Sequence, residues 1–180
     1  MGVTTALLTV EQYAQLPEEE TMRTELVEGE IVRMGDAKFL HERVKANAIR
    51  LLVQYVLQNK IGEVFSESMY KLDRREGRIP DVSLLLQETL ARQDRAGFLE
   101  GAPDLAFEVV SSESAAFMER KVNLFLAKGC CAVWVAYPIE RTFWIHRAAG
   151  SIHLREGQFV EEPDLLPGFR AAVERFFDGI

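Results

Sequence analysis

The sequence has few cysteines and no long apolar run. Only two of its 180 residues are cysteine, and they stand side by side at Cys130 and Cys131. Adjacent cysteines form neither a disulfide framework nor the spaced ligand pairs of a structural zinc site. We expect both to be small buried residues in a reducing, cytoplasmic setting. No apolar stretch approaches the length that crosses a bilayer, so no membrane partner is expected.

Positive charge is also in short supply. Lys and Arg number 21 against 28 Asp and Glu, which gives a formal net charge of -7, and the isoelectric point is near 5.1. This balance excludes a protein that coats nucleic acid through bulk charge, so a nucleic-acid partner would need a local basic surface. Candidate phosphate contacts, which could equally be solvated side chains, are Lys71, Arg74, Arg75, Arg78, Arg120 and Lys128.

The remaining composition, with 48% hydrophobic residues, is that of a globular chain. No repeat or linker divides it, so we expect one domain over 1–180. The hydrophobic periodicity predicts an α/β (α+β) fold, with one mixed β-sheet flanked by helices. Helices are expected after Thr9 as far as Pro17, then over 41–58, 114–128 and 169–177. A hairpin over 25–34 and strands over 64–72, 79–86, 105–110, 130–137, 141–147, 151–154 and 158–160, the last two as a pair, complete the prediction.

Lys121 stands out within the helix expected over 114–128. Its neighbours at three and four residues on either side are all apolar: Phe117, Met118, Leu124 and Phe125. A lysine on the core-facing stripe of a helix either extends its stem to reach solvent or directs a buried ammonium at an anionic partner. The pattern alone leaves both readings open.

Two acidic residues, Asp81 and Glu108, interrupt apolar strands and are candidate partners for Lys121. A carboxylate that faces the core needs a salt bridge, a metal or a cleft, although either acid alone is more often a strand-end or edge residue. Together they could hold magnesium or manganese, with the carbonyl of Val109 as a further ligand. Such a metal polarises a phosphodiester, and a lysine can orient water or offset phosphoryl charge. These are the requirements of a nuclease.

The order of these residues also resembles a known family. Pro80-Asp81 followed by Glu108-Val109-Val110 resembles the PD-(D/E)XK nuclease motif, with Val110 where the lysine usually stands and Lys121 as its migrated replacement. Over nearly the whole chain the sequence is similar to the Uma family of restriction endonucleases, a bacterial branch of that superfamily. The matching positions are 25–30, His41, 80–81, 101–111, Lys121, Phe125, Gly129, Trp134, Pro138 and 166–169. The resemblance implies a restriction-endonuclease-like core and metal-dependent phosphodiester cleavage.

The sequence departs from the family pattern at three positions around this set. Phe117, Ala132 and Tyr137 stand where the family often has Asp, Glu and Asp. None of the three belongs to the proposed triad. The departures bear instead on the supporting hydrogen bonds, which can affect metal affinity.

Six further residues have a type or position that bears on the site. The resemblance makes Glu25 an acid that could reach the metal or its water, whereas its place in a hairpin also fits an exposed residue. His41 could cap its helix or line the cleft. We expect Trp134 and Trp144 to be core residues rather than base-stacking platforms. His146 and His153 are expected on the polar face of the sheet.

The resulting hypothesis is a metal-dependent endonuclease, a hydrolase acting on DNA phosphodiesters. Asp81, Glu108 and Val109 would hold magnesium or manganese, Lys121 would position water, and Glu25 would assist. One alternative is a catalytically silent nuclease fold that binds a partner and keeps these residues as a buried ion network. Another is a hydrolase of a small phosphorylated molecule. Analogy to the fold leaves a homodimer open.

Overall fold

The largest element of the computed structural model is a mixed six-stranded sheet in the order β11-β10-β9-β8-β6-β3. The model describes residues 7–35, 38–94, 96–111 and 114–180. The strands are β3 (Gly62–Ser66), β6 (Val82–Leu86), β8 (Leu105–Val109), β9 (Ala132–Tyr137), β10 (Thr142–Arg147) and β11 (Gly150–Leu154). Only β8 and β9 pair in parallel within this sheet as described. A parallel pair needs a crossover, and helix α5 (Ala115–Ala127) supplies it.

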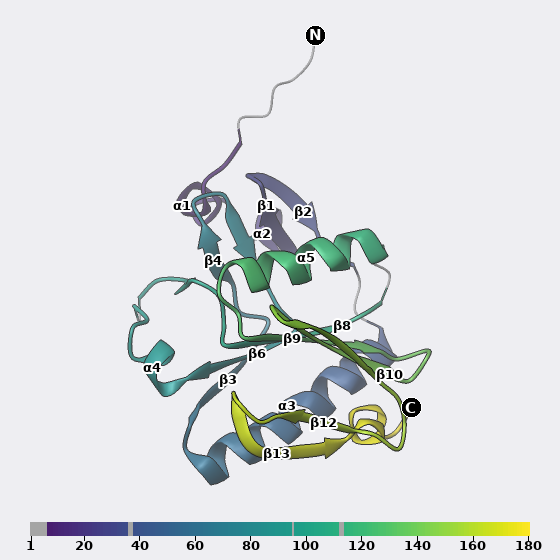
Figure 1. Ribbon diagram of the computed structural model, residues 1–180. Helices are drawn as coiled ribbons and strands as arrows, with labels where there is room; N and C mark the ends of the chain where they lie inside the picture. The colour runs from purple at the N-terminus through teal and green to yellow at the C-terminus, as the bar shows by residue number, and fades with distance from the viewer. Residues whose placement is uncertain (1–6, 36–37, 95, 112–113) are drawn as a thin grey trace.

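Two long helices cover opposite faces of this sheet (Figure 1). Helix α3 (Phe39–Asn59) packs on one face, where Leu105, Phe107 and Val109 of β8 join the larger apolar cluster. Helix α5 packs on the other face, where Ala106 joins a smaller cluster with α5 side chains. The alternation of side chains along a strand places Glu108 on the α5 face. Strand β8 therefore contributes to two different environments.

A second sheet, in the order β2-β1-β5-β4-β7, lies at the amino-terminal end of the molecule (Figure 1). Its strands are β1 (Thr24–Val27), β2 (Glu30–Arg33), β4 (Tyr70–Asp73), β5 (Glu76–Arg78) and β7 (Leu99–Glu100). The predicted hairpin is confirmed as β1 and β2. Its turn residues Glu28 and Gly29 have φ of 52° and 87°, the left-handed conformation of a type I′ turn. The short helices are α1 (Val10–Tyr13), α2 (Glu18–Thr21) and α4 (Gln87–Leu90).

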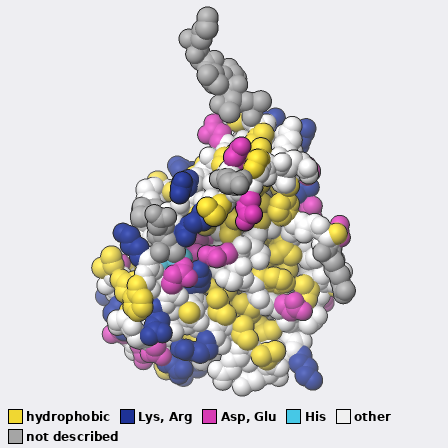
Figure 2. All heavy atoms as spheres, turned by 180° about the vertical axis from the view of Figure 1, so that it is seen from behind, with side chains coloured by type: hydrophobic (Ala, Val, Ile, Leu, Met, Phe, Trp, Pro, Cys, Tyr) yellow, Lys and Arg dark blue, Asp and Glu magenta, His cyan; other side chains and the backbone are white. Residues whose placement is uncertain are grey.

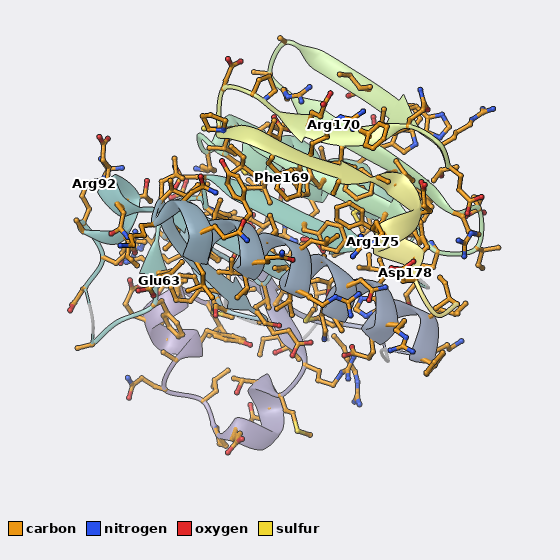
Figure 3. The ribbon with its side chains drawn as sticks, turned by 90° about the horizontal axis from the view of Figure 1, so that it is seen from below. Glu63, Arg92, Phe169, Arg170, Arg175 and Asp178 are labelled. Carbon is orange, nitrogen blue, oxygen red and sulfur yellow. The ribbon has the colours of Figure 1, made fainter. Side chains whose placement is uncertain are left out.

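The carboxyl-terminal segment covers the α3 side of the large sheet. Strands β12 (Phe159–Glu162) and β13 (Leu166–Ala172) pair with each other and lead into the 3₁₀-helix η1 (Val173–Phe177). The side chain of Phe169, a residue of β13, points toward α3 in the view from below (Figure 3). Its ring contacts Tyr55 edge-on, with centroids 5.4 Å apart, and it also lies 5.5 Å from Trp134. This segment closes the larger core.

The predicted fold class is confirmed, with four corrections. The single predicted sheet is three sheets among the described residues, of six, five and two strands. The run over 64–72 is two strands in different sheets, because Glu67 adopts a left-handed φ of 49° between β3 and β4. Strand β11 pairs with β10 rather than with β12. The closing helix predicted over 169–177 is strand β13 as far as Ala172 and the 3₁₀-helix η1 from Val173 to Phe177. In the strand part, Phe169 and Ala171 are buried on either side of exposed Arg170, a period of two.

Smaller predictions were also tested. The capping box of Thr9 and Gln12 is confirmed, but the first helix ends at Tyr13, and Pro17 precedes α2 instead of ending α1. Cys130 is buried as expected, whereas Cys131 is exposed. Among the described residues, no helix is long and apolar enough to cross a membrane.

Candidate active site

Lys121 is buried and directs its ammonium at carboxylates. Its Nζ lies 2.9 Å and 3.0 Å from the two carboxylate oxygens of Glu108, and 2.9 Å from Oε1 of Glu25. It also donates a hydrogen bond to the carbonyl of Ile79 at 2.9 Å. Only 4% of the residue is exposed. Of the two readings that the sequence left open, the buried ammonium is therefore confirmed.

Asp81 lies beside Glu108 at the same end of two neighbouring strands. The pairing of Val82 with Phe107 sets this register, because the preceding residue of β6 then lies opposite Glu108. Asp81 Oδ2 accepts a hydrogen bond from the backbone N–H of Val109 at 2.7 Å. Its other oxygen lies 3.2 Å from Nε2 of His41. Both oxygens of Asp81 are thus held in place.

Glu25 reaches the cluster from the second sheet. The pairing of Leu26 with Gly77 places β1 beside the segment that leads to Asp81. Glu25 Oε1 accepts from the backbone N–H of Ile79 at 2.9 Å, and Oε2 lies 3.4 Å from Nη1 of Arg78. Because only 2% of Glu25 is exposed, the interpretation as an exposed hairpin residue is wrong.

A line of charged groups continues from Asp81 along the start of α3. His41 Nδ1 lies 3.3 Å from Glu42, which is 2.8 Å from the ammonium of Lys45. Lys45 also lies 2.9 Å from Glu67, the residue with the left-handed backbone. His41 is buried and lines the site, which answers the question that its helix-start position left open.

Burial and neighbouring charge shift the pKa values in opposite directions. Burial, assisted by Asp81 and Glu25, raises the pKa of Glu108 well above its usual value despite the ammonium of Lys121. Burial alone would raise the pKa of Asp81, but His41, Lys121 and the Val109 N–H together lower it. The pKa of Lys121 is raised, since its carboxylate neighbours outweigh burial. Hence Lys121 is a cation, and Glu108 is the acid that holds a proton most readily.

The cluster opens into a pocket of about 360 Å³. Glu25, Asp81, Glu108 and Lys121 all line it. Phe117 and Met118 of α5 form an apolar part of the wall, and Phe117 is a position where the family often has an acid. A pocket of this size, apolar in part and with a few converging charged groups, is typical of a ligand or active site.

The residues fit a divalent cation in part. Among the described residues, no group of three or more His, Cys, Asp or Glu is placed to hold a metal. The oxygens of Asp81 and Glu108 are nevertheless hard donors, and magnesium is commonly held by one or two carboxylates with water and substrate phosphate completing its shell. Within the described chain, Glu108 Oε1 is the buried side-chain atom that makes no hydrogen bond of good geometry. That oxygen is the best available donor to a cation.

The basic side chains expected to contact phosphate are mostly engaged elsewhere. Lys71 pairs with Glu11 and Glu100, and Lys128 pairs with Asp73. Arg78 is buried behind Glu25, and none of these cations lines the pocket. Arg74, Arg75 and Arg120 do not line it either. On the face seen in Figure 2, Lys and Arg side chains are mixed with Asp and Glu rather than gathered in one basic field.

Sequence reasoning missed three residues that line the pocket: Arg23, Arg33 and Glu67. Arg33 pairs with Thr24, the residue after Arg23, so the two arginines bracket the hairpin that carries Glu25. No local pattern in the sequence marks the two arginines, because only the pairing of β1 with β2 brings them together. Nothing in the sequence marks Glu67, whose position depends on the left-handed backbone conformation that separates β3 from β4.

The two tryptophans differ from each other. Trp134 is fully buried, as predicted. Trp144 is half-buried on the α5 side, where it stacks with His146 at 5.8 Å and with His153 at 4.5 Å between ring centroids. The expectation that both are core residues is therefore correct for Trp134 alone.

Comparison with known proteins agrees with this geometry. Residues 10–174 match the model of the Uma2 family, described as "Putative restriction endonuclease". The chain belongs to this family. The suspected family is thereby confirmed, and the match includes Glu25, Asp81, Glu108 and Lys121.

Two individual proteins resemble this Uma2-family chain. A Synechocystis protein described as "Uncharacterized protein sll1609" is 29% identical over 116 residues. That match spans 63% of this chain and 64% of the relative, so less than two thirds of either. The crystal structure of a protein from Anabaena variabilis, described as "a putative nuclease belonging to DUF820", superposes with a TM-score of 0.82. The superposition includes 94% of this chain and 97% of the Anabaena chain, at 20% sequence identity, and it establishes a shared fold.

Proposed function

We propose that this chain is a divalent-metal-dependent nuclease that hydrolyses phosphodiester bonds in DNA. The observation that carries the proposal is the convergence of Glu25, Asp81, Glu108 and Lys121 from separate elements on one pocket. Burying three carboxylates is costly, and a fold rarely retains such a set without a use for it. The family description agrees with this chemistry.

Asp81 and Glu108 would hold magnesium or manganese, and the carbonyl of Val109 would add a backbone oxygen. Such an ion, when bound, supplies a polarised phosphoryl oxygen and an activated water. His41 and the Val109 N–H hold Asp81 in position, which limits the reorganisation needed. Lys121 would place positive charge beside the position where phosphoryl charge develops. Glu25 orients the ammonium of Lys121.

A second function, that of a catalytically silent binding protein, is favoured by one observation. The three partners of the Lys121 ammonium are Glu108, Glu25 and the Ile79 carbonyl, which match the three N–H bonds that a lysine has. In this arrangement the lysine has no donor left for water. Catalysis therefore requires Lys121 to release one partner, and a metal that draws Glu108 away would permit this.

Cleavage assays distinguish the two functions. Plasmid, single-stranded DNA and RNA would be incubated with magnesium or manganese and the native chain, Asp81→Asn, Glu108→Gln or Lys121→Met. Matched exposed controls are Asp178→Asn, Glu63→Gln and Lys128→Met, which lie outside the pocket lining. We expect cleavage by the native chain and the controls and none by the three site variants.

The other outcomes are equally informative. No cleavage of any substrate, together with no heat of metal binding in calorimetry, would support the silent binding protein. Turnover of a small phosphodiester such as bis(4-nitrophenyl) phosphate, without cleavage of nucleic acid, would indicate a hydrolase of small phosphorylated molecules. Cleavage that persists in Asp81→Asn would contradict the assigned roles. Light scattering of the same samples tests the homodimer that paired double-strand cuts would require.

A further inference from the structure

Most cations near the pocket are already neutralised by carboxylates. Lys121 is shared between Glu25 and Glu108, and Lys45 lies between Glu42 and Glu67. His41, which lines the pocket and can also become positive, faces Asp81. These groups offset the local acids, so they offer little net attraction to an incoming polyanion.

Arg23 and Arg33 are different. Both line the pocket and both are exposed. Arg23 Nη2 donates to the carbonyl of Gly35 at 2.6 Å, an interaction that leaves its charge unneutralised. Arg33 makes no side-chain hydrogen bond or ion pair with any part of the chain that the structure describes. Two arginines with no carboxylate partner among the described residues therefore line a pocket that also holds the three acids.

The hairpin fixes the two arginines relative to the acids. Arg33 pairs across β1 and β2 with Thr24, and the next pair inward is Glu25 with Val32. Glu25 is in turn tied to Ile79 and Lys121. Arg23 has a left-handed φ of 55°, uncommon for a long side chain, and its backbone carbonyl accepts from the N–H of Met34. The arginines thus share a rigid base with the candidate catalytic cluster.

We propose that Arg23 and Arg33 form the phosphate-binding wall of this site and hold the backbone phosphates that flank the bond to be cleaved. Guanidinium groups bind phosphate in a bidentate manner and stay charged at all relevant pH values. A chain with a net charge of -7 repels nucleic acid overall, so two uncompensated charges at the pocket have a large relative effect. The inference rests on the proposed function for the identity of the substrate.

Binding of a fluorescein-labelled single strand, followed by anisotropy in EDTA over a range of salt concentrations, tests this wall without requiring cleavage. Arg33→Gln is the cleanest variant, because the side chain has no hydrogen-bond or ion-pair partner to lose within the described part of the chain. The double variant Arg23→Gln with Arg33→Gln removes both charges, and thermal melting checks its fold. Each phosphate contact that is lost should lower the slope of log affinity against log salt by about 0.7.

The control matches the double variant in charge. Arg155 is exposed, and its side chain makes no hydrogen bond or ion pair within the described residues. Arg92 is exposed and donates one hydrogen bond, to Thr89, as Arg23 does to Gly35. Neither control residue lines the pocket, and Arg92 projects from the edge that carries α4 (Figure 3). Arg92→Gln with Arg155→Gln therefore changes the net charge equally without touching the site.

We expect the pocket pair to lose affinity and to lower the salt slope by about 1.4, while the control pair keeps the native slope. The proposed phosphate-binding role of Arg23 and Arg33 would be wrong if both double variants changed the affinity and salt slope equally. It would also be wrong if the native chain showed no measurable binding at low salt. Failure of the nuclease is a separate result: a chain that binds through Arg23 and Arg33 but never cuts would retain the wall and lose the proposed activity. If the double variant Arg23→Gln with Arg33→Gln bound and cleaved nucleic acid as the native chain does, the proposed nuclease activity would stand and the proposed role of the two arginines would be wrong.

Discussion

The two faces of the large sheet are built from the same strands and have opposite characters. On the α3 face, β8 contributes Leu105, Phe107 and Val109 to an apolar core rich in aromatic rings. On the α5 face the same strand contributes Ala106 and the carboxylate of Glu108, which meets a lysine. One face stabilises the fold, and the other accepts an energetic cost to hold a charged cluster.

The apolar face is stabilised mainly by the packing of aromatic and aliphatic side chains. Phe143 lies 4.7 Å from Phe176 and 5.6 Å from Trp134 between ring centroids. The indole N–H of Trp134 donates to buried Glu162 at 2.9 Å, so the polar atom of that ring is also paired. Full burial of each such ring removes apolar area worth roughly 1.5–3 kcal/mol from water. Positions of this kind determine which fold forms.

The buried charged groups on the α5 face compensate one another only when all of them are present. The cluster sets three carboxyl groups, those of Glu25, Asp81 and Glu108, against the cations Lys121 and Arg78, and His41 can carry a further positive charge. Removing one member leaves a buried charge without its partner. The contrast teaches that one strand can carry a stabilising side and a costly functional side, and substitutions on the two sides should behave differently.

The largest loss of stability is expected on the apolar face. Trp134→Ala removes a fully buried ring and leaves Glu162 without its indole donor, so the free energy of unfolding should fall by about 3–5 kcal/mol. Urea denaturation monitored by circular dichroism measures this change. Trp144→Ala, which removes a half-buried tryptophan from the opposite face, should cost clearly less. Equal losses of unfolding free energy in Trp134→Ala and Trp144→Ala would contradict the difference in stabilising role between the two faces.

Lys121→Met tests the charged face. Methionine keeps the packing against α5 neighbours but leaves Glu25 and Glu108 uncompensated, so stability at neutral pH should fall by about 3 kcal/mol. The loss is limited because the two acids can take up protons. Lys128→Met, which breaks a partly exposed pair with Asp73, should cost less than about 1 kcal/mol. A neutral Lys121→Met variant would mean that the cluster carries little strain.

Glu108→Gln should raise the free energy of unfolding, unlike the substitutions on the apolar face. The pKa of Glu108 is raised in the folded protein by burial, so the folded state holds a proton that the unfolded state has lost once pH exceeds the ordinary glutamate range. Native stability therefore falls as pH rises through that window, and the glutamine variant lacks this fall. Melting in EDTA should show the stability advantage of the glutamine variant growing as the pH rises from roughly 4, near the ordinary glutamate pKa, to roughly 8. Glu63→Gln, an exposed control, should show no such trend.

The smallest effect is expected at the surface, far from either face. Lys71 lowers the pKa of Glu11 to about 2, chiefly through a side-chain hydrogen bond. This pair therefore stabilises the fold above the ordinary glutamate pKa, and its contribution disappears as pH falls toward 2. Glu11→Gln should lower the denaturation midpoint slightly at pH 7, well above the ordinary pKa, and coincide with the native chain near pH 2. A difference that persists in acid would point to a cause other than charge.

The family, the fold class and the convergence of four site residues could be predicted from the sequence. Motif order carried this information, because Asp81, Glu108 and Lys121 each broke a local apolar pattern and each matched a family position. Their catalytic roles stay predictions until the assays are done. Long amphipathic segments such as α3 and α5 were also predicted well, since a period of 3.6 residues over many turns is a strong signal.

Other features depend on contacts that local periodicity does not encode. Strand periodicity indicates which residues share a face but not which sheet a strand joins, so the break at Glu67 was missed. The strand β13 was read as helix because its short apolar run fits either period. Arg23 and Arg33 carried no apolar context to make them stand out, and only the closed hairpin places them beside the acids.

The charged cluster also has a consequence for how the chain is made. Its members come from β1, from the connection before β6, from β8 and from α5, so every contact among them joins distant parts of the sequence. Such contacts form later than local helices and hairpins. During synthesis, Glu25 and Asp81 leave the ribosome before Lys121 can reach them. The site is therefore complete only when α5 docks, and a chain that lacks α5 cannot assemble it.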